Sequence, residues 1–214
     1  MTRMDKDYYA YIKRFFRLLA PFYDYATFFT FRMRVMVVDF TAAAKDERIL
    51  DIATGTGQQA FAFGKRGYEI VGIDVSSDML KIACGKNKYQ TVSLALTDAT
   101  ALPFADNCFN TSTASFGLHE MPQHIREKVI QEMARVIKPE GKIVIVDYAL
   151  PRNSVARHFF YSLIRVYEGK YYPQFVNSDL EATLKKCGIS VEKILLIALG
   201  NVRFLKGISK KETP

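Results

Sequence analysis

Cysteine is scarce in this 214-residue chain, and its three copies, Cys84, Cys108 and Cys187, are widely spaced. No Cys-x-x-Cys or Cys/His spacing is present, which argues against a disulfide framework and against a metal site. We therefore expect reduced thiols in a cytoplasmic protein that binds no metal. Long apolar runs are also missing. No stretch approaches the roughly 20 apolar residues of a membrane-spanning helix, and positive charges interrupt the N-terminal stretch that a signal peptide would keep apolar.

The middle of the chain lacks the basic excess of the whole. The net charge is +8, of which residues 1–50 contribute +3, residues 51–150 contribute −1 and residues 151–214 contribute +6. Phe and Tyr follow the same division, since twelve of the 28 precede residue 51 and eight follow residue 150. Amphipathic helices that cover a sheet would explain this distribution. The alternative is an apolar substrate pocket, or a surface that meets anionic lipid headgroups.

Short apolar runs alternate with helical patterns in the central section. Strands are expected at 48–53, 68–73, 91–96, 109–115 and 142–147, and helices at 58–66, 76–86 and 122–137. This alternation predicts βαβ units, a parallel sheet and helices on both of its faces.

The flanking sections have other patterns. Helices are expected at 5–19, 24–44, 153–169 and from Asn177 or Ser178 to Cys187, and the last strands at 189–199 and 202–208. Gly200-Asn201 between these strands predicts a tight antiparallel hairpin. No repeat or linker divides the chain. We predict a single domain, 1–214, with a doubly wound, mostly parallel seven-stranded sheet: a helical cap (1–46), a core (47–150), and helices and a final hairpin on the substrate side (151–214).

Glycines and acidic residues follow three successive predicted strands. Gly55 and Gly57 come after the first, where they let the backbone turn sharply and approach a ligand. Asp51, near the end of that strand, can accept hydrogen bonds from an ammonium group. Asp74 after the second strand can accept from the hydroxyls of a ribose, and Asp98 after the third can accept from an adenine amino group. We expect the three carboxylates to converge in one crevice for an adenosine-type ligand.

These motifs resemble those of the class I S-adenosylmethionine (SAM)-dependent methyltransferases, and within them the ubiquinone/menaquinone biosynthesis C-methyltransferases. The resemblance covers roughly residues 20–150. It is carried by Phe22-Tyr-Asp24, Leu50-Asp-Ile-Ala-Thr-Gly-Thr-Gly57, Gly72-Ile-Asp-Val-Ser-Ser-Asp-Met-Leu80, Asp98-Ala-Thr-Ala-Leu-Pro-Phe-Ala-Asp-Asn-Cys-Phe109, Ser115-Phe-Gly-Leu118 and Ala134-Arg-Val-Ile-Lys-Pro-Glu-Gly-Lys142. It implies SAM as cofactor, S-adenosyl-L-homocysteine as product, and a SAM-binding role for the core. The terminal hairpin is similar to the family's antiparallel seventh strand.

On the methionine side, the resemblance implies that the glycine-rich loop holds SAM through Asp51, Ala53, Gly55 and Gly57. Ala53 departs from the family, where many members have glycine. Ser115, which ends the fourth predicted strand, would lie beside the sulfonium.

On the adenosine side, the resemblance implies that Asp74 holds the ribose. Val75 and Met79 would lie beside the adenine, and Asp98 and Ala99 would face it.

Methyl transfer from a sulfonium requires alignment and exclusion of water, and a base only where the acceptor arrives protonated. His119, after the fourth strand, is the leading candidate for that base, and Glu120 is the second. A residue that only packs or caps at the helix start is the alternative reading of His119. Tyr23 would close over SAM from the N-terminal segment. His119-Glu120 replaces the Arg-Asn expected from the quinone enzymes.

The expected function is methyl transfer from SAM to a small or amphiphilic acceptor, with a quinone-like acceptor as the leading version. A phospholipid or small-metabolite N- or O-methyltransferase is one alternative, and a non-catalytic adenosyl-ligand-binding module is another. A nicotinamide-dependent reductase is disfavoured, because the one Tyr-x-x-x-Lys, at Tyr9–Lys13, precedes the first strand. Nucleic acid is not an expected partner, because no Asn-Pro-Pro-Tyr or Asp-Pro-Pro-Tyr follows the fourth strand. Peripheral membrane contact stays open.

Overall fold

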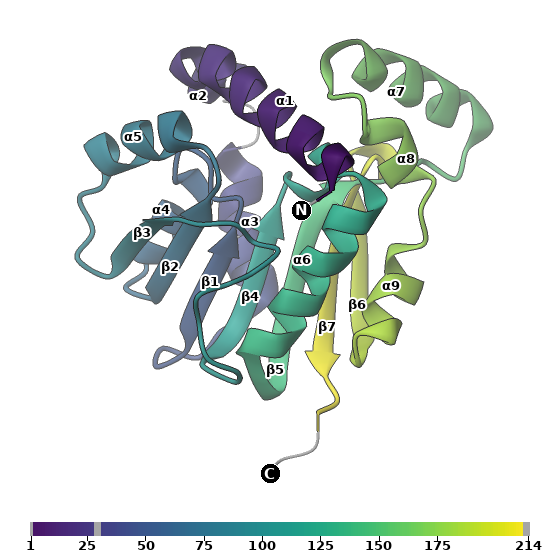
Figure 1. Cartoon of the computed structure of the whole chain (residues 1–214). Coiled ribbons are helices and arrows are strands. Elements are labelled where there is room, and N and C mark those ends of the chain that lie inside the picture. The colour runs from purple at the N-terminus through teal and green to yellow at the C-terminus, as the bar shows by residue number, and fades with distance from the viewer. Residues whose placement is uncertain (1, 28–30, 212–214) are drawn as a thin grey trace.

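The computed structural model describes residues 2–27 and 31–211, and within these ranges seven strands form one sheet (Figure 1). Their order is β3-β2-β1-β4-β5-β7-β6. The strands are β1 (Arg48–Ile52), β2 (Glu69–Asp74), β3 (Val92–Leu96), β4 (Phe109–Ser115), β5 (Ile137–Tyr148), β6 (Ile189–Ile197) and β7 (Val202–Ser209). Strands β1 to β5 are parallel, and β7 lies antiparallel between β5 and β6. The predicted doubly wound, mostly parallel sheet with a terminal antiparallel hairpin is confirmed.

Helices cover both faces of this sheet. They are α1 (Arg3–Leu19), α2 (Tyr23–Ala26), α3 (Phe31–Thr41), α4 (Gln58–Gly64), α5 (Ser77–Lys86), α6 (Gln123–Val136), α7 (Ser154–Tyr167), α8 (Tyr172–Val176) and α9 (Leu180–Lys186), with 3-10 turns η1 (Ala20–Phe22), η3 (Leu118–Glu120) and η4 (Ala198–Gly200). One hydrophobic cluster joins α1, α6 and α9 to the sheet, and a second joins α3 and α4. Neighbours in β1 alternate between them, since Leu50 belongs to the first and Ile49 to the second.

The N-terminal helix α1 crosses over the carboxyl ends of the strands (Figure 1). A capping box begins it: Thr2 Oγ1 accepts from the Asp5 N–H, and Asp5 Oδ2 accepts from the Thr2 N–H. Its inward face buries Tyr8 and Ile12. The apolar period of the sequence therefore identified the helix, while its position above the sheet comes from packing.

The single helix predicted over residues 24–44 is wrong. Helix α2 ends at Ala26, where Thr27 Oγ1 donates to the Tyr23 carbonyl, and such a bond competes with continuation of the helix. Residues 28–30 lie outside the described residues. Helix α3 ends at Thr41 because Ala42 has a left-handed φ of 50°.

The predicted two-residue hairpin at Gly200-Asn201 is also wrong. Strand β6 ends at Ile197, and η4 with Asn201 forms the link to β7. Leu199 and Gly200 have φ values of 58° and 89°. The Asn201 carbonyl accepts from the Ala149 N–H at 2.8 Å, so this link is tied to the end of β5.

Two further boundaries differ from the prediction. Strand β5 begins at Ile137 rather than at Lys142, because the segment predicted to end a helix pairs with β4 across an irregular register. Helix α9 is capped by Asp179, whose side chain accepts from the Ala182 N–H, rather than by Asn177 or Ser178. Asn177 and Ser178 instead follow α8, which the sequence did not predict. The division into cap, core and substrate-side segment stays a prediction.

Candidate functional site

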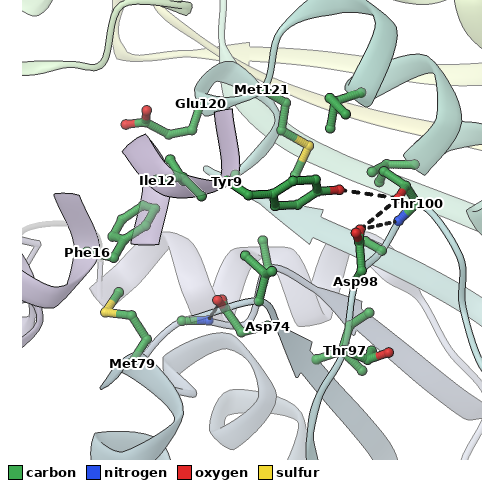
Figure 2. Close-up of a pocket in the computed structure, with 18 of the residues that line it drawn as sticks. Tyr9, Ile12, Phe16, Asp74, Met79, Thr97, Asp98, Thr100, Glu120 and Met121 are labelled. Atoms are coloured by element: carbon green, nitrogen blue, oxygen red, sulfur yellow. Dashed lines mark hydrogen bonds between the residues drawn. The ribbon is translucent and has the colours of Figure 1, made fainter. Parts of the chain in front are cut away.

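A pocket lies between α1 and the carboxyl ends of β1, β2 and β3, and we call it the strand-end pocket. Figure 2 shows part of its lining. Of the residues predicted for a cofactor or for catalysis, those that line it are Tyr23, Ala53, Gly55, Asp74, Val75, Met79, Asp98, Ala99 and Glu120. The fold therefore gathers most of the predicted adenosine side at one place.

The glycine-rich loop at this pocket depends on left-handed backbone. Gly57 has a φ of 82°, and a Cβ on it would lie 2.5 Å from Cζ of Phe61. Ala53 also has a positive φ, of 53°. That conformation explains why glycine would be favoured at Ala53 and why the alanine here is strained.

Asp74 ties this loop to the end of β2. Its Oδ2 accepts from the Gly55 N–H at 2.8 Å, and its Oδ1 accepts from the Ser76 N–H at 2.8 Å. Burial raises the pKa of Asp74, against the effect of these backbone donors. The carboxylate thus fixes the loop, and it also lines the pocket where a ribose was expected.

Asp98 sits in a local turn at the end of β3. Its Oδ1 accepts from both the N–H and the Oγ1–H of Thr100, each at 2.8 Å (Figure 2). The hydroxyl of Tyr9 lies 3.3 Å from Thr100 Oγ1, which links α1 to this turn. Ala99 lies between the two turn residues and lines the same pocket.

Asp51 and Ser115 do not line the strand-end pocket itself. They line a small adjoining cavity of about 10 Å³, which shares Tyr23 and Ala53 with the strand-end pocket. The Asp51 carboxylate accepts from Thr54 Oγ1 at 2.7 Å and Thr113 Oγ1 at 2.8 Å. Burial raises the pKa of Asp51 to about 6. Asp74 and Asp98 therefore share the strand-end pocket, while Asp51 reaches the site from the adjoining small cavity.

Side chains of α1 fill much of the strand-end pocket, and the sequence did not single them out. Tyr8, Tyr9, Ile12 and Phe16 line it, and its free volume is about 60 Å³. Ligand pockets commonly measure roughly 300–1,000 Å³. A nucleoside-sized ligand therefore requires α1 to shift outward. The sequence showed that these residues recur with a helical period, but it did not show that they pack into this pocket.

A second and larger hollow, the aromatic cavity, has a volume of about 470 Å³. Its lining consists of Phe15, Phe16, Leu19, Tyr23, Thr27, Arg34, Phe116, His119, Glu120, Tyr148, Tyr167 and Glu168. Phe16, Tyr23, Phe116 and Glu120 line both this cavity and the strand-end pocket. The two hollows are therefore adjacent and share one wall.

His119 lies at the polar wall of the aromatic cavity and is almost fully buried. Its Nδ1 lies 2.7 Å from Asp147 Oδ1, and its Nε2 lies 3.0 Å from Glu168 Oε2. Burial lowers the pKa of His119, but these two carboxylates outweigh that effect and raise it well above its usual value. The sequence singled out His119 but neither Asp147 nor Glu168 as its partner.

Glu120 lies beside this imidazole. Its Oε1 is 3.7 Å from His119 Nε2, and burial raises the pKa of Glu120 to about 7. Glu168 is held from its other side, because the Tyr148 hydroxyl donates to Glu168 Oε1 at 2.6 Å. The second candidate base of the sequence thus belongs to the same cluster as the first.

Tyr23 lies at the boundary of both hollows, and its position follows from Asp24. The Asp24 carboxylate accepts from Thr56 Oγ1 and Gln58 Nε2, each at 2.6 Å, and pairs with Lys86. These contacts pin α2 onto the glycine-rich loop. They give a structural reason for the Phe22-Tyr-Asp24 motif.

Comparison with known proteins places the chain among methyltransferases. A family model described as a methyltransferase domain matches residues 49–141. The demethylmenaquinone methyltransferase of Renibacterium salmoninarum is 41% identical over 122 residues, which are 57% of this chain and 50% of that protein. The enzyme of the same name from Thermus thermophilus is 32% identical over 187 residues, covering 77% of this chain and 84% of that protein.

The chain spans about half the length of the first two curated relatives it matches. Among solved structures, the YcgJ protein of Bacillus subtilis superposes with a TM-score of 0.67 at 20% identity, covering 85% of this chain and 100% of that one. At this identity the superposition supports the fold alone.

Proposed function

We infer the function of this chain from its family, because it belongs to the class I SAM-dependent methyltransferases of the ubiquinone/menaquinone C-methyltransferase branch. We propose that it transfers a methyl group from SAM to a small or amphiphilic, quinone-like acceptor. The observation that carries this proposal is that the strand-end pocket and the aromatic cavity lie on the two sides of one shared wall. A flat, apolar ring in the aromatic cavity would lie next to the place where the cofactor's sulfonium is expected. Aromatic side chains suit such a ring.

The methionine part of SAM fits the loop after β1. Ala53, Gly55 and Gly57 would follow its backbone, and Asp51 would accept from its ammonium group. Ser115 Oγ has no hydrogen-bond partner among the residues described, so it has unused capacity for a ligand. Each oxygen of the buried Asp51 carboxylate accepts one hydrogen bond and keeps a second lone pair for another donor. When bound, SAM supplies an electrophilic methyl group on a good leaving group.

The adenosine part fits the strand-end pocket. Asp74 would accept from the ribose hydroxyls, and Val75 and Met79 would pack beside the adenine. Asp98 would accept from the adenine amino group, with the backbone of Ala99 beside the ring. Helix α1 would then close over the ligand and exclude water.

Tyr23 and His119 are the residues that we place next to the reacting atoms. Tyr23 separates the two hollows, so it would bound the path between sulfur and acceptor. His119 is the histidine among the residues that line the aromatic cavity, and it forms a polar wall with Glu120 and Glu168. An acceptor hydroxyl at this wall would meet groups able to accept its proton.

A membrane surface is the partner that we propose for the exterior of α7. Its exposed apolar residues Val155, Phe159, Leu163 and Val166 recur at steps of three and four. They form one apolar stripe on a helix of a basic segment, as in helices that lie on anionic lipid. No helix in the described part of the chain is long and apolar enough to cross a membrane. The free thiols agree with the cytoplasmic location that we propose.

A second candidate acceptor is an amine. The aromatic cavity combines carboxylates with several aromatic rings, and that combination binds ammonium groups in other settings. N-methylation of a small or lipid amine would use the same cofactor pocket. The product distinguishes it from the quinone-like acceptor.

The test is a methyl-transfer assay with isotope-labelled SAM. A reduced demethylated naphthoquinone and phosphatidylethanolamine vesicles are offered separately, and mass spectrometry identifies the product. We expect label on a ring carbon of the naphthoquinol. Label only on the amine would favour the second candidate. SAM binding by calorimetry without any labelled product would favour a non-catalytic module and contradict the proposal.

A further inference from the structure

We propose that His119, Glu120 and Glu168 form a binding site for one divalent transition-metal ion in the wall of the aromatic cavity. The sequence predicted no metal, because the chain has no Cys/His spacing of that kind. His119 and Glu120 lie in η3, whereas Glu168 follows α7 almost fifty residues later. The fold brings them together where η3 and the segment after α7 meet beside the end of β5.

The donor atoms have the separation that a metal site needs. One nitrogen and two carboxylate oxygens lie within 4.8 Å of one another. His119 Nε2 is 3.0 Å from Glu168 Oε2 and 3.7 Å from Glu120 Oε1. Ligands at roughly 2.1 Å from a tetrahedral ion lie about 3.4 Å apart. Both separations from the imidazole nitrogen therefore lie within a few tenths of an ångström of that value.

The groups behind the donors orient them as in known metal sites. Asp147 Oδ2 is fixed by the N–H groups of Leu118 at 3.0 Å and His119 at 3.3 Å, and its Oδ1 faces His119 Nδ1. Because a carboxylate only accepts, both ring nitrogens donate in these contacts, Nδ1 to Asp147 and Nε2 to Glu168, and a metal ion would take the place of the Nε2 proton. This carboxylate–histidine order is typical behind a metal ligand. The Tyr148 hydroxyl orients Glu168 in the same way.

An unused acceptor inside the cluster provides an independent indication. The Glu120 side chain is 6% exposed, and its Oε2 has no hydrogen-bond partner in the part of the chain that the structure describes. Glu168 and Asp147 are 15% and 3% exposed. Buried carboxylates are costly without donors or a cation. One divalent ion would offset this excess of negative charge.

The donor set also indicates which ions fit the site and how many coordination positions the protein leaves open. One imidazole with two carboxylates suits Zn²⁺, Mn²⁺ or Fe²⁺, whereas Mg²⁺ prefers oxygen ligands alone. Three protein ligands leave at least one position for another ligand. All three residues line the aromatic cavity, so that position faces the acceptor. If the proposed function holds, an acceptor hydroxyl would bind there as an oxyanion after releasing its proton to solvent.

A metal titration of the full chain tests the site. Protein stripped with a chelator is titrated with Zn²⁺ by calorimetry and with Co²⁺ by visible absorption, in the absence of SAM. We expect one equivalent of each ion to bind. His119→Gln and Glu168→Gln should weaken binding by roughly tenfold or more. His124→Gln is the matched control, because His124 Nε2 pairs with Asp5 Oδ1 at 2.9 Å outside the cluster, and it should bind as the parent does.

Gly169→Ala keeps every donor and tests their placement. A Cβ at this position would lie 2.1 Å from Glu120 Oε2, so the carboxylate must move away. We expect weaker Co²⁺ binding in this variant and an altered spectrum. Circular dichroism melts establish that each variant is folded.

The outcomes separate this site from the proposed function. Failure of the parent chain to bind Zn²⁺ or Co²⁺ at one equivalent overturns the site, as does binding that the cluster variants leave unchanged. A parallel titration with SAM, and a methyl-transfer assay in chelator, report on function independently. A chain that methylates its acceptor without metal refutes the metal's role while the proposed function stands. A chain that binds one ion but no SAM supports the site and refutes the function.

Discussion

Replacing Asp51 by asparagine tests the electrostatics at the start of the glycine-rich loop. Asp51 is 1% exposed, and burial raises its pKa from 3.8 to about 6 although two threonine hydroxyls donate to it. The unfolded chain ionises this group near 3.8 and the folded chain near 6. Folding stability therefore falls as the pH rises from about 3.8 to 6, and above pH 6 the folded chain bears the full free-energy cost of burying the ionised carboxylate. The shift corresponds to about 3 kcal/mol.

Asparagine keeps the shape of the side chain and removes the charge. Above pH 6, the free energy of unfolding of Asp51→Asn should exceed that of the parent chain by about 1–3 kcal/mol, which raises Tm by about 2–10 °C in a chain of this length. Near pH 4 the two chains should be nearly equal. The same substitution should weaken SAM binding roughly tenfold to a hundredfold, because the ammonium group loses a charged acceptor.

Urea melts of both chains between about pH 4 and pH 8 measure the stability difference, and calorimetry measures SAM binding. Asp39→Asn is the control, because exposed Asp39 pairs with Arg66, which lowers the pKa of Asp39. Its loss should lower stability slightly, with the opposite dependence on pH. Equal stability of Asp51→Asn and the parent at every pH would refute the assigned cost of burying this carboxylate.

Three other variants have defined outcomes. Asp74→Ala should weaken SAM binding in calorimetry by about one to two powers of ten, because it removes the ribose acceptor and frees the loop at Gly55. Unchanged affinity would contradict the ribose assignment. Gly57→Ala should lower Tm through its positive φ and the contact with Phe61, by an amount equivalent to about 1–3 kcal/mol. The paired change Phe159→Ser and Val166→Ser should reduce sedimentation with anionic vesicles and leave Tm within a few degrees, whereas undiminished sedimentation would exclude α7 as the membrane contact.

The local sequence pattern was sufficient to predict most strands of the sheet. Short apolar runs that end at glycine or aspartate predicted β1 to β4, because each run is long enough for one buried strand and the following residues favour a turn. The Gly55–Gly57 loop, Asp74 and Asp98 were found for the same reason: each lies at a strand end, and parallel topology brings strand ends to one edge. The helix predicted over residues 76–86 is present as α5, and Ser76 caps it by accepting from the Met79 N–H.

Contacts between segments that are distant in the chain determined the features that the local sequence pattern could not predict. The bond from Ala149 to Asn201 reshaped the last hairpin, and packing of Tyr8 and Ile12 placed α1 over the strand-end pocket. Asp51 faces an adjoining cavity because neighbouring residues of a strand point to opposite faces and Thr54 and Thr113 hold its carboxylate. The grouping of His119 with Glu168 needed the whole fold, since the two residues lie almost fifty positions apart in the chain. The sequence by itself determines which glycines and acidic residues lie at strand ends, and tertiary packing determines which of them meet.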